Sequence, residues 1–337
     1  MKVLGKIFFI LVFTTVTLYA LSNSNYLIEL SVTHEFNLEK FTTSFSYSAT
    51  ISMLLVRYSC IYHNKDAIQK IIDFLPKEYK ISEIQPHKID KFLNNFGTFI
   101  KIHRYFHFQA LIYPPMLVLI NFINTGEKMF PFEVKFPFYA FRNEIYPFLL
   151  LWVLISHYIY VLSYVVSENI TYGLTTIISV ELKLLAVKYQ NSFSNLEDLK
   201  VFIKNQNELY DIIEELQRIY GISFFANFLM SSILLCFTAF MTSVSPDLQL
   251  LIFNAIFCLI TMIQIFIQCF FGQILYDANL NLVDSIYECG WENMKDVNLK
   301  KFLVFVIKRS QKCAAFSLLG IWKITLEQFK SVSLKFQ

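Results

Sequence analysis

The stretch LQLLIFNAIFCLITMIQIFIQCFF, residues 248–271, decides the fold class of this chain. It contains no Asp, Glu, Lys or Arg. Backbone amides in lipid must bond within their own segment, so roughly 20 apolar helical residues are needed to cross a bilayer core about 30 Å thick. This stretch meets that length and therefore predicts a transmembrane helix.

The rest of the chain is similarly rich in apolar residues. Of its 337 residues, 55% are hydrophobic and 16% are charged, and the mean hydropathy is +0.47. Soluble domains have a far more polar mixture. No Pro-, Gly- or Ser-rich linker divides the chain, and apolar runs recur from one end to the other. We therefore expect an all-α integral membrane protein, with one seven-helix membrane domain over residues 1–337.

The apolar runs predict seven spans. They lie at about residues 3–21, 42–61, 105–124, 147–166, 222–242, 248–271 and, in broken form, 302–337. The first run also has the pattern of a secretory signal peptide, and its cleavage would leave six spans with the same later orientation. Pro114 and Pro115 should kink the third span. The Phe- and Pro-rich residues 125–146 should fold back over the protein.

Polar features between the spans predict further helices. Residues 195–220 place apolar side chains on one helical face, namely Leu199, Phe202, Ile203, Leu209, Ile212, Ile213 and Leu216. A second polar helix is expected at 273–288. Together, residues 181–220 and 273–312 should form a cytoplasmic helical anchor. Arg57, within the second span, is expected to extend its long side chain to the headgroups.

Basic residues orient the spans, because Lys and Arg of short loops mark the cytoplasmic side. With Lys2 and Lys6 inside, the three inner loops hold eight, five and three Lys or Arg residues, and the three outer loops hold one, three and none. The bias predicts a cytoplasmic N-terminus and an extracellular C-terminus. This orientation is opposite to that of a G-protein-coupled receptor.

Motifs of common enzymes are missing from the sequence. It contains no Cys-x-x-Cys, GxxxxGK[ST], GxGxxG, HExxH or GxSxG, so nothing favours an enzyme or a bound cofactor. His103 and His107 have the i, i+4 spacing of two metal ligands, but no third ligand accompanies them, so no metal site is expected. The net charge of +3 is too small to indicate nucleic acid as a partner.

Residues of the C-terminal third resemble a known family. DSIY at 284–287 lies between Gly272 and Trp291, and it is followed by KRSQK at 308–312, LG at 319–320 and TLEQF at 325–329. This order and spacing, together with the seven spans and the inside N-terminus, resemble the insect odorant receptors. The gustatory receptors, which share this topology, are the nearest alternative. A transporter is a more distant alternative, because the chain shows no pair of related halves.

The resemblance implies an odorant-gated cation channel subunit that detects small volatile molecules. Such subunits lie in the plasma membrane of sensory neuron dendrites or cilia and form heterotetramers with a co-receptor. This chain is similar to a tuning subunit, because it lacks the co-receptor's long insertion between the fourth and fifth spans. The final helix segment, with Thr325, Phe329 and Val332, would line the pore. Residues 325–337 make about 20 Å of helix, so the last span is expected to be truncated.

In this family the ligand lies in the outer halves of the helices that precede the pore. Depth and residue type, with no motif, select the candidates, and for each of them ordinary helix packing or lipid contact is the more common role of such a side chain. The candidates are Tyr47, Ile51, Tyr113, Met116, Leu117, Leu150, Leu154, His157, Phe253 and Phe257. His157 and Tyr113 stand out because they are polar at membrane depth.

Overall fold

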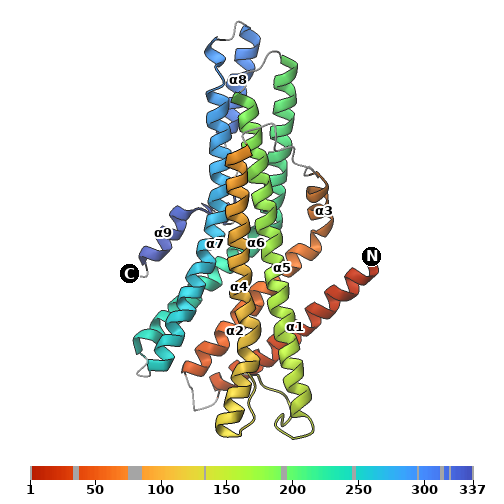
Figure 1. Cartoon of the computed structure of the whole chain (residues 1–337), viewed down its shortest axis with the longest axis vertical. Helices are drawn as coiled ribbons and strands as arrows, with labels where there is room; N and C mark the ends of the chain where they lie inside the picture. The colour runs from red at the N-terminus through yellow and green to blue at the C-terminus, as the bar shows by residue number, and fades with distance from the viewer. Residues whose placement is uncertain are drawn as a thin grey trace. The chain divides into compact units, whose positions relative to one another are not determined.

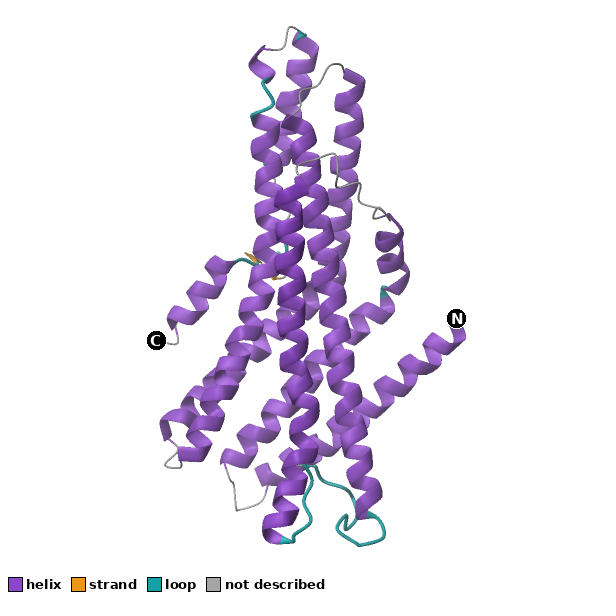
Figure 2. Ribbon diagram, viewed as in Figure 1, coloured by secondary structure: helices purple, strands orange, loops and turns teal. Residues whose placement is uncertain are grey.

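The computed structural model of the chain is predominantly helical (Figure 1, Figure 2). It describes residues 2–32, 38–74, 86–132, 134–190, 196–244, 248–293, 296–311, 315–318 and 320–335. The elements are α1 (Lys2–Val32), α2 (Leu38–His63), α3 (Lys65–Phe74), α4 (Pro86–Thr125), α5 (Tyr146–Gln190), α6 (Leu196–Val244), α7 (Leu248–Tyr287), η2 (Trp291–Asn293), α8 (Val297–Ser310), β1 (Ser317–Leu318), β2 (Trp322–Lys323) and α9 (Leu326–Lys335).

Four of the described helices are much longer than a membrane span. Helices α4, α5, α6 and α7 contain 40, 45, 49 and 40 residues. The predicted polar helix at 195–220 and the fifth span are one helix, α6, and the predicted helix at 273–288 continues the sixth span within α7. No proline interrupts either helix, and a single glycine costs a helix only about 1 kcal/mol. The boundaries predicted inside them are therefore absent.

Within the described residues, three helices are long and apolar enough to cross a membrane. They are Tyr146–Tyr189, Glu197–Ser243 and Asn254–Tyr287, and a fourth apolar helix, Leu111–Thr125, is shorter. All four overlap predicted spans. Helix α4 continues through both Pro114 and Pro115.

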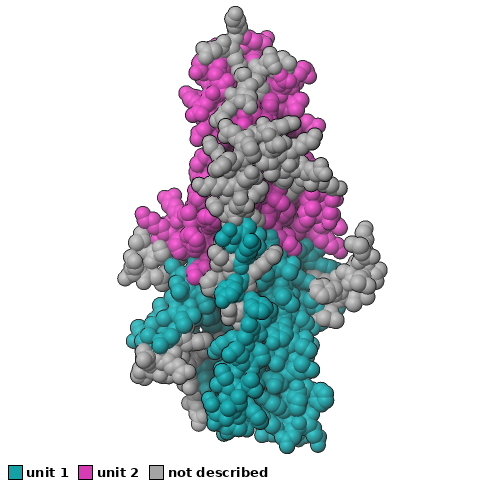
Figure 3. Space-filling model, viewed as in Figure 1, with its two compact units in different colours: residues 1–63, 96–169, 226–262 teal, residues 64–95, 170–225, 263–337 magenta. Residues whose placement is uncertain are grey.

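The chain divides into two compact units, shown in teal and magenta in Figure 3. The first contains residues 1–63, 96–169 and 226–262, and the second contains residues 64–95, 170–225 and 263–337. Helices α5, α6 and α7 each contribute residues to both units. Each unit has its own buried side chains.

The first unit is built around α1, α2 and the start of α5. Helix α1 packs against α2, and the irregular residues 126–145 add Phe130, Phe132 and Ala140 to the core that these helices form. The backbone N–H of Lys135 donates to the carbonyl oxygen of Ser22 at 3.1 Å. The Phe- and Pro-rich segment therefore folds back over the protein, as the sequence predicts.

The second unit contains the amphipathic part of α6. Leu199, Ile213 and Leu216 are buried, whereas Asp211 and Glu214 are exposed, so the predicted apolar face is confirmed. The same unit holds a stacked pair of rings, Tyr172 of α5 and Phe271 of α7, 4.4 Å apart.

The predicted interruption of the last apolar segment is present in the second unit. Helix α8 ends at Ser310, and an antiparallel hairpin pairs Ser317 with Lys323 before α9 begins. Gly320 has a φ of 76° in the turn of this hairpin, a conformation that glycine adopts without steric cost. The apolar run at 314–321, expected to be part of a broken span, is therefore a strand and a turn where it is described.

Candidate ligand site

Phe132 is the centre of an aromatic cluster in the first unit. Its ring centroid lies 4.8 Å from that of Tyr47 in an edge-to-face arrangement and 4.5 Å from that of His157. The ring of Tyr19 meets it edge-on at 6.2 Å. We call these four residues the Phe132 cluster. Three of them come from helices α1, α2 and α5, and Phe132 comes from the irregular segment between α4 and α5.

Aliphatic side chains complete the walls of the cluster. Ile51 and Leu54 of α2 and Val153 of α5 are buried in the same core, and Leu150 packs against it. A lining of rings and branched side chains with few polar groups is typical of sites for small apolar ligands. This arrangement can bind a molecule through shape, dispersion and one or two hydrogen bonds.

A row of side chains on α5 leads away from the cluster. The ring of His157 lies 6.1 Å from that of Tyr160, and Tyr160 lies 6.3 Å from Tyr164. These positions are three and four residues apart, so they occupy one face of the helix. Four residues further along the same face is Glu168. The row therefore connects the Phe132 cluster to a carboxylate.

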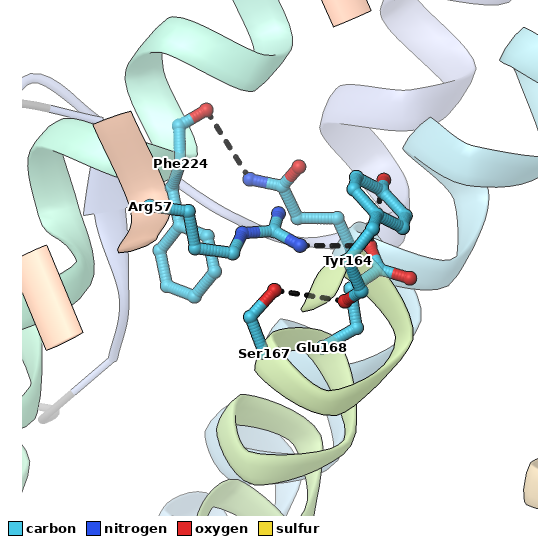
Figure 4. Close-up of polar contacts among 6 residues, drawn as sticks. Arg57, Tyr164, Ser167, Glu168 and Phe224 are labelled. Carbon is cyan, nitrogen blue, oxygen red and sulfur yellow. Dashed lines mark hydrogen bonds and ion pairs between the residues drawn. The ribbon is translucent and has the colours of Figure 1, made fainter. Parts of the chain in front are cut away.

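Glu168 forms a buried ion pair with Arg57 of α2 (Figure 4). The distance from Arg57 Nη1 to Glu168 Oε1 is 3.0 Å, and the two side chains are 4% and 2% exposed. The Tyr164 hydroxyl donates to the same carboxylate oxygen at 3.0 Å. The guanidinium carbon also lies 5.4 Å from the centroid of the Tyr164 ring, within the range of a cation–π contact.

The prediction that Arg57 reaches the headgroups is therefore wrong. A long basic side chain extends to the membrane surface when no acidic partner lies at its own depth. Glu168, 111 residues further along the chain, supplies that partner. Removing either member of a buried pair would leave a charge without its counterion. The pair therefore ties α2 to α5 within the first unit.

In the second unit, the segment before α9 lies against α7. The backbone N–H of Leu326 donates to Gln273 Oε1 at 3.2 Å. The ring of Phe329 meets that of Phe266 edge-on at 5.3 Å. Gly272 is closest to this segment, because a Cβ atom at that position would lie 2.2 Å from the carbonyl oxygen of Ile324. In the same unit, Gln268 donates to the carbonyl oxygen of Phe224 at 3.3 Å (Figure 4).

Comparison with known proteins decides the family. The sequence profile of the 7tm odorant receptor family matches residues 37–334. The chain belongs to this odorant receptor family. Its sequence is 26% identical to odorant receptor 67c of Drosophila melanogaster over 274 residues, which are 77% of this chain and 66% of that receptor. Odorant receptor 85b of the same species is 30% identical over 139 residues, which are 40% of this chain and 35% of that receptor.

Solved structures share the fold of this odorant receptor family chain. The olfactory receptor OR5 from Machilis hrabei is similar with a TM-score of 0.79 at 14% identity, covering 96% of this chain and 85% of that one. The same receptor in complex with eugenol gives a TM-score of 0.77 at 13% identity. By sequence, the chain spans just under two thirds of the length of receptor 67c and about a third of receptor 85b.

The structure brings together four of the ten residues predicted to bind the odorant. Tyr47, Ile51, Leu150 and His157 all belong to the Phe132 cluster or its walls. Among the candidates whose side chains are described, the other five are not in its ring contacts or core residues. Tyr113 and Met116 are each 51% exposed, Leu117, Leu154 and Phe257 are partly buried, and the side chain of Phe253 lies outside the described residues.

The structure describes the side chains of two of the three predicted pore residues, Thr325 and Phe329. Thr325 is buried and its carbonyl oxygen accepts bonds from the backbone of Gln328 and Phe329 at the start of α9. The side chain of Val332 lies outside the described residues. Among the residues that the structure does describe, no three His, Cys, Asp or Glu side chains gather where they could hold a metal ion. The side chains of His103 and His107 are outside that set.

Sequence reasoning missed four residues of this receptor's candidate site: Tyr19, Phe132, Tyr160 and Glu168. Phe132 lies in a segment that cannot be a span, so depth could not select it. Glu168 lies two residues beyond the predicted end of the fourth span. Its signal was the spacing of three and four residues from His157 through Tyr160 and Tyr164, which puts a carboxylate on the same face as a polar candidate.

Proposed function

We propose that this chain is an odorant receptor subunit that binds small volatile molecules at the Phe132 cluster and opens a cation channel in response. Four predicted ligand residues that were selected only by depth and type converge on one buried aromatic cluster, and this observation carries the proposal. The family assignment supports the same function. The chain shares its fold with a receptor whose structure was solved in complex with eugenol, which makes eugenol a suitable first probe.

The proposed receptor is a multi-pass plasma membrane protein with seven spans. Its N-terminus is cytoplasmic and its C-terminus extracellular, as the distribution of Lys and Arg favours. Residues 181–220 and 273–312 belong to a cytoplasmic helical anchor. In a sensory neuron, the chain acts as a tuning subunit in a heterotetramer with a co-receptor. The last helix segment contributes Thr325, which directly precedes α9, and Phe329 and Val332 of α9 to the pore.

Gating in this proposal is a shift between closed and open populations. A ligand can shift such an equilibrium only by binding one state more tightly than the other. The side chains of the Phe132 cluster come from three helices and an irregular segment, so a bound molecule changes the packing among all of them. Ligand binding at the cluster is therefore transmitted to the helices as a change in their packing.

Ligand-evoked current tests the function directly. The chain is expressed with and without a co-receptor subunit, and eugenol and related aromatic volatiles are applied under voltage clamp. A concentration-dependent cation current that requires both subunits supports the proposal. The matched variant His157→Ala should shift the concentration dependence while surface abundance is preserved. A protein that reaches the surface with its co-receptor and conducts no current with any volatile of the panel would contradict the proposed function.

A further inference from the structure

The hydroxyl of Tyr19 is an unusual polar group in the core of the first unit. Tyr19 lies on α1 and is 1% exposed, and its hydroxyl has no hydrogen-bond partner among the residues that the structure describes. Buried hydroxyls are normally bonded, because leaving one unpaired costs free energy. The hydroxyl of Tyr146, in the same core, donates to the carbonyl oxygen of Met129 at 2.7 Å. Tyr19 therefore differs from a tyrosine that serves packing alone.

The surroundings of Tyr19 belong to the candidate ligand site. Its ring meets Phe132 edge-on, and Tyr47 and Tyr160 pack against the same core. Phe132 is the one member of the cluster held by a non-helical segment. A hydroxyl that lacks a partner among the described residues thus lies beside the ring at the centre of the candidate ligand site.

We propose that the Tyr19 hydroxyl is the polar anchor of the ligand site and selects volatile ligands that carry an oxygen atom. The inference rests on the proposed function of the Phe132 cluster. The O–H group donates to the phenol, alcohol or carbonyl oxygen of the ligand, while the rings and aliphatic walls enclose its apolar part. A hydrocarbon of the same shape leaves the hydroxyl unpaired. The ligand class is therefore a small apolar molecule with one uncharged oxygen group.

A pair of matched probes measures this selectivity. Para-cresol and para-xylene have nearly the same shape and differ by a hydroxyl in place of a methyl group. A hydrogen bond between neutral groups contributes a preference of about 3- to 10-fold. We expect the wild-type chain, purified at full length, to bind para-cresol more tightly than para-xylene by that factor in calorimetric titrations.

Tyr19→Phe removes only the oxygen atom and should reduce the preference to about 1-fold, because neither probe then finds a donor. The control Tyr146→Phe removes a hydroxyl that is already bonded to Met129 and should leave the preference unchanged. The wild-type ratio tests the inference even where a variant does not fold.

Two results would overturn the inference. One is a wild-type protein that binds both probes equally, and the other is a Tyr19→Phe variant that retains the preference for para-cresol. A wild-type protein that binds neither probe would contradict the ligand site itself, and with it the proposed function, rather than the role of Tyr19 alone.

Discussion

Replacing Arg57 with Met removes the guanidinium from the buried pair with Glu168 and keeps an unbranched apolar side chain. The carboxylate then keeps the hydroxyl of Tyr164, 3.0 Å away, and loses its counterion. Both side chains are at most 4% exposed, so water cannot replace the lost charge. Breaking a buried pair in this way costs about 3–5 kcal/mol.

The pair Lys135–Glu29 in the same unit is a matched control. Its side chains are 43% and 42% exposed, and exposed pairs contribute about 0.2–1 kcal/mol. Lys135→Met should therefore destabilise the protein several-fold less than Arg57→Met. The double variant Arg57→Met/Glu168→Met removes both charges and should recover most of the lost stability, because a buried pair replaced by apolar side chains is often neutral.

Equilibrium unfolding of the purified protein in mixed detergents measures these differences. The four proteins needed are the wild type, the two single variants and the double variant. Equal losses for Arg57→Met and Lys135→Met would refute the reasoning, because the losses would then not depend on burial. A double variant that is as unstable as Arg57→Met alone would also refute it, because the two charges would not be coupled.

Three further substitutions test other parts of the structure. Gly272→Ala places a Cβ atom 2.2 Å from the backbone oxygen of Ile324, so it should loosen the segment before α9 at a cost of about 1–3 kcal/mol. Faster protease cleavage near that segment would measure this loosening. Gly173→Ala, whose Cβ atom would meet nothing within 4 Å, is the control. Phe132→Ala removes a ring from the cluster and should raise the affinity for bulkier aromatic volatiles relative to small ones in titrations. Tyr113→Ala removes a predicted ligand residue that lies outside the Phe132 cluster and is 51% exposed, so it should preserve both surface assembly and the ligand response; a changed ligand ranking at unchanged surface abundance would contradict the placement of the site at the cluster.

The sequence predicts the helices well where hydrophobicity alone decides. The run at 248–271 has no charge and the length of a membrane span, and it lies entirely within α7. The end of that helix could not be predicted, because Gly272 is tolerated within a helix and no proline follows it before Tyr287. The run at 314–321 is too short for its apolar pattern to distinguish strand from helix. The turn at Gly320 decides between them.

Tertiary contacts explain what could not be predicted of the site. His157 is predicted because a polar side chain at membrane depth usually has a specific role, and Tyr47 is predicted by its depth and residue type. The partner of Arg57 could not be identified, because Glu168 is 111 residues away and no local pattern couples the two. Phe132 was missed for the same reason, since its position beside α2 and α5 follows from how residues 126–145 fold back.

Direct ligand binding at the Phe132 cluster is the most decisive measurement for this receptor. Trp152 packs against the core that contains the cluster, and substituting Phe for the two other tryptophans, Trp291 and Trp322, leaves it as the single fluorescent reporter. Titration with para-cresol should change its emission in a saturable way, and His157→Ala should weaken that binding. Emission that does not change, or a titration curve that His157→Ala leaves unaltered, would contradict the placement of the ligand at this cluster.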